Sequence, residues 1–263
     1  MTFKPPILTI TLGAVLIFVL GPGWAPAPAP EVKEQVKDCQ PVFGAEVCTW
    51  SRMSGSRVVA FGATVPMASI ENSPDEFPMS WPPVELAEIP MPADARSATG
   101  VNHLTVLWEA HGHPPAPFLT PHFDFHFYVI DGDTRKAITC ADSTKPATLP
   151  AGYSLPDMEL PELGRLVGIC APKMGMHSLP TAMLQDTVIF TGTMVMGFYE
   201  GRPIFYEPMI ARAKLLERRS FSLPMVTPAG LAAGVHYPTK FDAEYDPAMP
   251  GYRFVFSGLS GGN

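Results

Sequence analysis

The feature that most constrains the fold is the strictly alternating stretch 122–128, with the sequence HFDFHFY. Polar side chains occupy positions 122, 124 and 126 of this stretch, and phenylalanine rings occupy the positions between and after them, 123, 125 and 127. A repeat of two residues is the period of a β-strand, so the rings share one face and His122, Asp124 and His126 share the opposite face. We therefore expect a central strand, antiparallel to its neighbours, whose polar face offers metal ligands or acid and base groups to a cavity.

The spacing along a strand limits which of these groups can share one ion. A strand rises about 3.3 Å per residue, so residues two apart lie about 7 Å apart. Joint ligation is feasible for His111 with His113, for His122 with Asp124, and for Asp124 with His126. Ideal strand geometry separates His122 from His126 by about 13 Å, too far for one ion unless a bulge shortens the gap. The remaining ligands must come from other segments.

The composition favours short strands over helices. Of the 263 residues, 31 are prolines and only 16% are charged. Proline interrupts helix interiors and central strands, which favours short strands joined by long loops. We expect an all-β fold, mainly an antiparallel barrel or sandwich, with one or two short helices. The best amphipathic helix in the sequence is Ile210–Arg219.

The N-terminal region has the pattern of a targeting segment. An apolar run, Ile7–Leu20, follows Lys4 and precedes a Gly-Pro-Gly turn. This length suits the hydrophobic region of an export signal, and an uncleaved N-terminal anchor is the alternative. A short helix is expected at Glu31–Lys37. The expected organisation is a signal peptide or anchor at 1–23, a proline-rich spacer with this helix at 24–38, a single β-rich domain at 39–257, and a flexible tail at 258–263.

The cysteine content also points to a location outside the cytoplasm. The chain has four cysteines, Cys39, Cys48, Cys140 and Cys170, an even number that is typical of an oxidising compartment. Of the three connectivities that four cysteines allow, pairing of neighbours is the simplest. We therefore expect a periplasmic, secreted or membrane-anchored protein.

Two residues outside the alternating strand are further candidate ligands. His177 follows Gly175 in a Met-Gly-Met-His segment, where a tight bend would present the imidazole. Glu207 ends an aromatic strand just before Pro208 and could point inward, although Pro208 would also suit the first turn of a helix. The candidate metal ligands are thus His113, His122, His126 and His177, and Asp124 or Glu207 is a fourth ligand or a general base.

The cluster favours a metal or catalytic site over a purely structural role. Burying two histidines and an aspartate without partners costs several kcal/mol, and solvent exposure would leave a phenylalanine-rich strand with a non-random polar face. A divalent ion is expected, with zinc favoured and copper or iron as alternatives. Met174 and Met176 beside His177 are the feature that suggests copper.

Four motifs resemble an uncharacterised secreted bacterial domain family. They are H-P-P, then P-H-F-D-F-H-F-Y, then M-G-M-H, and then an aromatic-E-P-M segment, and together they span about Val101–Ile210. One member of that family belongs to a sigma-E regulon, which controls extracytoplasmic stress, in a thermophile. The resemblance implies an extracytoplasmic location and a shared constellation made of His113, His122, His126, His177 and Glu207. It implies no known reaction.

A second resemblance is to cupin barrels. Cupins pair an H-x-H motif with a downstream Glu and a later His, and His111-Gly-His113 with His177 is similar in outline. The glycines and the Glu at cupin spacing are absent from this sequence. The expected fold therefore stays at an antiparallel barrel or sandwich.

These observations support three hypotheses for the function. The first is an exported metal-binding protein with a His-rich site in a β-barrel, acting as a metal-dependent hydrolase or lyase. The second is a non-enzymatic envelope module that binds a ligand or partner and uses the histidines as a metal-buffering patch. The third is a structural scaffold in a homo-oligomer.

The expected partners follow from charge and targeting. The formal net charge of -7 gives no basic surface, so nucleic acid is excluded as a partner. A small-molecule ligand is compatible with the site. The apolar content of the chain is compatible with homo-oligomerisation. Contact with a membrane would be made only through an uncleaved N-terminal segment.

Overall fold

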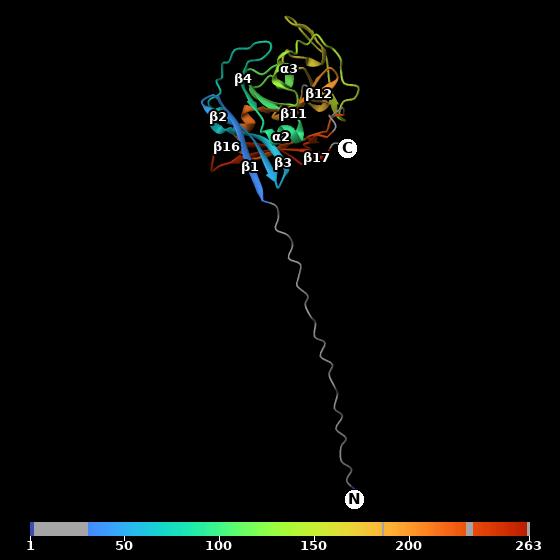
Figure 1. Ribbon diagram of the computed structural model, residues 1–263. Coiled ribbons are helices and arrows are strands. Elements are labelled where there is room, and N and C mark those ends of the chain that lie inside the picture. Colours follow the sequence, from blue (N-terminus) through green and yellow to red (C-terminus); the bar gives the residue numbers. More distant parts are fainter. Residues whose placement is uncertain (3–30, 186, 230–233, 262–263) are drawn as a thin grey trace. The chain divides into compact units, whose positions relative to one another are not determined.

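Two antiparallel sheets stack on one another (Figure 1). Aromatic side chains fill the space between them. The computed structural model describes residues 1–2, 31–185, 187–229 and 234–261. Glu31–Asn263 is one compact unit, and all the strands belong to it. The six-stranded sheet has the order β1 (Val32–Val42), β2 (Ala45–Ser54), β3 (Arg57–Pro66), β16 (Gly251–Ser257), β15 (Lys240–Asp246) and β13 (Phe221–Leu223).

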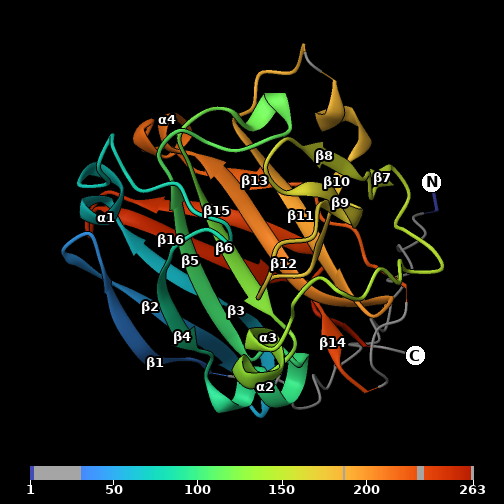
Figure 2. The ribbon, with the colours of Figure 1, turned by 90° about the horizontal axis from the view of Figure 1, so that it is seen from above.

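The second sheet has seven strands and carries the alternating stretch near its middle (Figure 2). Its order is β4 (Glu85–Pro90), β5 (His103–Glu109), β6 (His122–Tyr128), β12 (Arg202–Ala211), β11 (Gly192–Tyr199), β10 (Met176–Pro180) and β7 (Tyr153–Ser154). Two short pairs complete the strands, β8 (Met158–Leu160) with β9 (Gly164–Leu166), and β14 (His236–Tyr237) with β17 (Ser260–Gly261).

The all-β antiparallel fold is confirmed, and it is a sandwich. The expected β-barrel is wrong, because the sheets keep separate edges, at β1 and β13 in one and at β4 and β7 in the other. Each sheet buries one face against the other, so neither has to close on itself.

Helices are short but more numerous than the one or two expected. The described residues contain four α-helices, α1 (Met67–Glu71), α2 (Ala93–Thr99), α3 (Gly132–Lys136) and α4 (Arg212–Leu216). They also contain three 3₁₀ turns, η1 (Ala116–Phe118), η2 (Val167–Ile169) and η3 (Thr181–Leu184). Pro66 directly precedes α1, and Pro92 directly precedes α2. Each helix therefore begins at the residue after a proline.

The expectation for β6 is confirmed on both faces. The strand pairs antiparallel with β5 and with β12. Its rings point to the six-stranded sheet, where Phe125 contacts Phe254 and Phe127 contacts Phe256, each with ring centroids 4.8 Å apart. The polar residues of β6 therefore lie on the outer face of the seven-stranded sheet, away from the sandwich core.

Several local expectations near the ends of elements are wrong. Residues 31–37 extend into β1, which pairs with β2, because a seven-residue helix is too short to be stable without packing whereas a strand gains a full ladder of hydrogen bonds. The tail expected to be flexible from residue 258 contributes Ser260–Gly261 to β17. The helix expected at Ile210–Arg219 is reduced to α4, because Ile210 and Ala211 pair with β6.

The expected pairing of neighbouring cysteines is confirmed. One disulfide joins Cys39 to Cys48 between β1 and β2, and the other joins Cys140 to Cys170. Most of the expected signal or anchor, residues 3–23, lies outside the described residues. Within the described ranges, we find no helix with the length and apolarity needed to cross a membrane.

Replacement of Phe125 by Ala should destabilise the sandwich by about 3–5 kcal/mol, because it leaves a cavity where two sheets meet. Phe125 is fully buried, whereas Met79 is 74% exposed. Urea denaturation followed by tryptophan fluorescence measures the difference, and Met79→Ala is the control. A loss below about 1 kcal/mol for Phe125→Ala would contradict the core described here.

Candidate metal centre

The outer face of the seven-stranded sheet is covered by loops and short elements rather than by a third sheet. The segments that follow β5 and β6 pack over this face, and apolar side chains from both segments join its strands in a second buried cluster. Figure 2 shows β8, β9 and β10 beside β11 and β12. A pocket lies beneath this cover, and His113, Asp124, His126, His177 and Glu207 line it.

Three of the candidate residues form one group, which we call the His177 group: His126, His177 and Glu207. One ligand atom from each lies within 4.8 Å of the ligand atoms of the other two. The residues come from β6, β10 and β12, so the sheet itself brings them together. Side chains of His126 and Glu207 are almost fully buried.

Another three candidates form a second group, the His122 group: His113, His122 and Asp124. Their ligand atoms also lie within 4.8 Å of one another. His122 and Asp124 are on β6, and His113 comes from the loop after β5. Because β5 pairs with β6 up to His122, the loop that follows β5 returns over the start of β6. His113 is the most exposed member, with 30% of its side chain accessible.

Backbone carbonyls orient three of the four imidazoles. A carbonyl only accepts hydrogen bonds, so each ring nitrogen that contacts one must carry the proton. When such an imidazole is neutral, its remaining nitrogen, Nε2, presents a lone pair, which is the arrangement found for histidine ligands of metals. The three bonds run from His113 Nδ1 to Pro114 (2.8 Å), from His122 Nδ1 to Thr120 (2.7 Å), and from His177 Nδ1 to Ile169 (3.0 Å).

The nitrogens and carboxylate oxygens of both groups face one another without hydrogen bonds. His122 Nε2 lies 3.3 Å from Asp124 Oδ1, and neither atom has a hydrogen-bond partner. In the His177 group, His126 Nε2 lies 3.6 Å from Glu207 Oε2, and both of these atoms are also unpartnered. Each buried unpartnered group costs about 1–3 kcal/mol. A cation placed between the facing atoms would satisfy both.

Burial and mutual charge shift the pKa values of all these groups in the metal-free chain. Burial lowers the pKa of His122 and of His177 to about 4 and that of His126 to about 3. Burial alone would lower the pKa of His113 as well, but the adjacent Asp124 carboxylate outweighs it and raises this pKa to about 9. Most imidazoles are therefore neutral at pH 7, the state that binds metals.

The two carboxyl groups shift in opposite directions. Burial raises the pKa of Glu207 well above its usual range, and the nearby Asp124 charge adds to this effect. Burial acts in the same direction on Asp124, but His122 and His113 outweigh it and lower the pKa of Asp124. At pH 7 the metal-free chain therefore holds Asp124 as a carboxylate beside the imidazolium of His113, whereas burial favours the uncharged form of Glu207.

The ring of Phe205 packs against both imidazoles of the His177 group, whose own centroids are 5.9 Å apart. Its centroid lies 4.8 Å from that of His126 and 5.2 Å from that of His177. This position is open because residue 197, on the adjacent strand β11, is glycine. A Cβ atom at Gly197 would lie 1.9 Å from the Phe205 ring. Gly197 therefore leaves the room that the Phe205 ring needs beside the two imidazoles.

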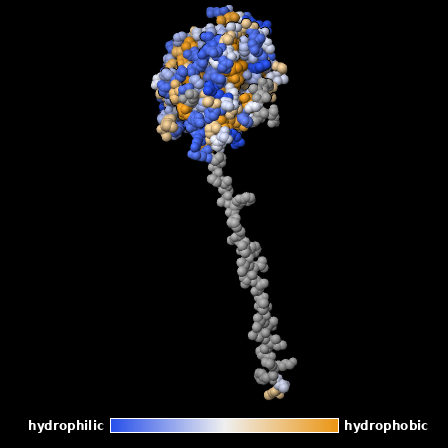
Figure 3. All heavy atoms as spheres, in the orientation of Figure 1, coloured by the Kyte–Doolittle hydropathy of each residue, from blue (hydrophilic) through white to orange (hydrophobic). Residues whose placement is uncertain are grey.

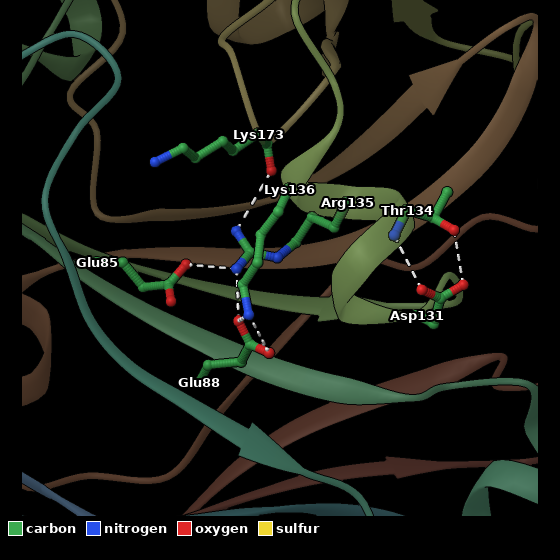
Figure 4. Close-up of polar contacts among 7 residues, drawn as sticks. All are labelled: Glu85, Glu88, Asp131, Thr134, Arg135, Lys136 and Lys173. Atoms are coloured by element: carbon green, nitrogen blue, oxygen red, sulfur yellow. Dashed lines mark hydrogen bonds and ion pairs between the residues drawn. The ribbon is translucent and has the colours of Figure 1, made fainter.

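Contacts outside the two groups hold the segment before His177 in place. The Cys140–Cys170 disulfide adjoins Ile169, whose carbonyl accepts the His177 hydrogen bond. Arg135 on α3 forms ion pairs with two glutamates of β4, and it donates to the carbonyl of Lys173 (Figure 4). These anchors fix the loop that carries the imidazole.

Arg135 also connects to the other imidazole of the His177 group. Its guanidinium lies 5.4 Å from the ring centroid of Tyr128, and Tyr128 stacks on His126 with centroids 5.6 Å apart. The same arginine therefore braces both histidines of this group.

The structure brings all six sequence-predicted residues to one pocket region but divides them into two groups. His122 and His126 fall in different groups, as the strand spacing predicts. His111 belongs to neither group, since its Nε2 lies 3.2 Å from Glu76 on the surface. The H-x-H motif therefore does not supply two ligands to one ion, unlike the cupin pattern.

Sequence reasoning missed the supporting elements of the site. The carbonyl acceptors carry no side-chain signal, and the role of Gly197 depends on a ring from the neighbouring strand. Trp81 belongs to a proline-rich loop, and it lines the pocket. The clustering of prolines around Trp81 was the one available signal.

Comparison with known proteins gives no relative: no family model, no curated protein and no solved structure matches this chain.

Stability of the metal-free protein should fall as the pH drops from 6.5 towards 4, and His103 offers a clean test. Burial lowers the pKa of His103 from 6.5 to about 4. Between these values the unfolded chain binds a proton that the folded chain does not, so unfolding becomes easier as pH falls. Replacement by Phe keeps the stack on Tyr128, where the centroids are 5.0 Å apart, and removes the titration.

The measurement is the free energy of unfolding in urea at several pH values after chelator treatment. His103→Phe should reduce the slope against pH by up to about 1.4 kcal/mol per pH unit. His236→Phe is the control, because His236 is exposed. Equal slopes for the wild type and His103→Phe would contradict the lowered pKa of His103 in the folded chain.

Proposed function

We propose that this chain is an exported metalloprotein that binds a divalent cation at His126, His177 and Glu207 and uses it for hydrolysis or lyase chemistry. The observation that carries the proposal is that His126 Nε2 and Glu207 Oε2 are buried 3.6 Å apart and that neither atom has a hydrogen-bond partner. His177 brings a third ligand atom within 4.8 Å, with its Nδ1 already bonded to a carbonyl.

Zinc is the metal that this ligand set favours. Two imidazoles and one carboxylate, with a further position open, is a common arrangement for catalytic zinc. The same set suits ferrous iron, and Met174 in the pocket wall is the feature that suits copper. Elemental analysis distinguishes the three metals.

The surrounding pocket supports an enzyme over a metal-buffering patch. A buffering patch needs only exposed histidines, whereas these ligands lie in a recess with apolar walls. The wall includes Trp81, Phe118, Met158, Leu160, Leu179 and Val195. A bound divalent ion would polarise a substrate oxygen and lower the pKa of a bound water towards about 7.

The chain's own contribution is to hold the ligands and to exclude water. Phe205, in the room left by Gly197, packs against both imidazoles, and the Ile169 carbonyl fixes the tautomer of His177. The apolar wall lowers the local dielectric, which strengthens electrostatic interactions with a bound substrate.

Two lines of reasoning support export and family membership. The two disulfides indicate an oxidising compartment outside the cytoplasm. We also propose that the chain belongs to the secreted bacterial family that its motifs resemble. Four residues of the shared constellation, His113, His126, His177 and Glu207, line one pocket, and His122 groups with His113 beside it.

Protein purified without a histidine tag should contain at least one equivalent of divalent metal per chain. Glu207→Gln keeps the size of the side chain but removes its charge, so it should weaken zinc binding at this group by at least about tenfold. Inductively coupled plasma mass spectrometry gives the content, and competition with a chromogenic chelator gives the affinity. His236→Ala is the control, and a metal-free wild type that cannot be loaded with zinc would overturn the proposal.

Gly197→Ala should weaken zinc binding at the same group by about 10–100-fold, because the new methyl group displaces the Phe205 ring that positions both imidazoles. The double variant Gly197→Ala with Phe205→Leu should recover part of the affinity, since the smaller side chain relieves the clash. Gly192→Ala, on the same strand but 3.3 Å from a flexible leucine, is the control. Equal affinity for Gly197→Ala and the control would contradict this role of Phe205.

A further inference from the structure

The His122 group has the features of a metal site in its own right. Its two imidazoles each donate Nδ1–H to a nearby carbonyl, so both Nε2 atoms are directed to Asp124. His122 Nε2 lies 3.3 Å from Oδ1 of this carboxylate, and His113 Nε2 lies 3.8 Å from Oδ2. Asp124 therefore has an imidazole nitrogen beside each of its oxygens.

Burial provides a second observation, independent of the clustering. The side chain of His122 is fully buried and that of Asp124 is 5% exposed. Both His122 Nε2 and Asp124 Oδ1 lack hydrogen-bond partners. Aromatic rings enclose the group, since His122 contacts Phe190 and His113 contacts Phe118. Solvent therefore cannot supply the missing partners easily.

Strand geometry places the two groups next to each other in one pocket. Asp124 and His126 are two residues apart on the same face of β6, so their Cα atoms are separated by about 7 Å. On β12, Met209 pairs with Asp124, which puts Glu207 one repeat further along, beside His126. Asp124, His113 and the whole His177 group line the same pocket.

We propose that the His122 group is a second divalent-cation site, so that the pocket holds a centre of two ions. This proposal rests on the proposed function, because it assumes that the His177 group binds the first ion. Each group brings one carboxylate, so two bound divalent ions leave net positive charge in an apolar recess. Among the described residues, Asp124 and Glu207 are the carboxylates that line the pocket. Glu109, which interacts electrostatically with His113 and Glu207, adds a single negative charge, so the two ions still carry the greater charge. The ligand class that such a centre favours is an anionic oxygen, carried by hydroxide or by a substrate carboxylate or phosphate.

The test is the number of zinc ions bound per folded chain, measured by isothermal titration of chelator-treated protein and checked by elemental analysis. Two equivalents are expected for the wild type and one for His122→Ala. Asp124→Asn, which conserves side-chain size, replaces His122→Ala if the latter does not fold. One equivalent is also expected for Glu207→Gln, and none for Asp124→Asn combined with Glu207→Gln.

His111→Ala is the matched control, because this imidazole is two residues from His113 yet pairs with Glu76 on the surface. It should leave two equivalents bound. One equivalent in the wild type, unchanged in Asp124→Asn, would overturn the second site and leave the proposed function standing. Two equivalents that persist in Asp124→Asn would also overturn it. No bound zinc in the wild type would overturn both proposals.

Discussion

The structure depends on the two opposed faces of β6. On one face, three phenylalanine rings pack against the six-stranded sheet, and on the other, His122, Asp124 and His126 are buried without sufficient partners. The favourable burial of the rings fixes the register of the strand, because a slip of one residue would exchange the two faces. The packing of the rings therefore holds the polar groups in a buried position, although hydration alone would favour their exposure to solvent.

This arrangement explains why so much of the chain covers the outer face of the seven-stranded sheet. Titratable groups on an open face would be hydrated and would titrate near their usual pKa values. Beneath the cover, burial keeps His126 and His177 neutral and raises the pKa of Glu207. The cover is anchored by the Cys140–Cys170 disulfide and by Arg135, whose ion pairs are largely shielded from solvent. On the face seen in Figure 3, by contrast, hydrophobic residues are interspersed with hydrophilic ones.

Much of the candidate site was predictable from the sequence, because its residues obey simple periodic rules. The alternation in β6 predicted the two faces, and the rise of a strand predicted that His122 and His126 would not easily share one ion. The supporting features were not predictable. Gly197 matters only because the ring of Phe205, from the neighbouring strand, packs directly over it. The carbonyls of Thr120 and Ile169 belong to the backbone, so the side-chain sequence gives no signal for them.

The sequence by itself determined the all-β class and the set of six candidate ligands, because these follow from period, composition and spacing along the chain. It left three disulfide connectivities open, and the structure selected the pairing of neighbouring cysteines. Only the tertiary structure decided that the sheets form a sandwich, that residues 31–37 extend a strand, and that His113 joins His122 while His177 joins His126. The physical reason is that such pairings depend on which strands lie side by side. Strand order is set by the burial of rings across the whole domain, which local sequence does not encode.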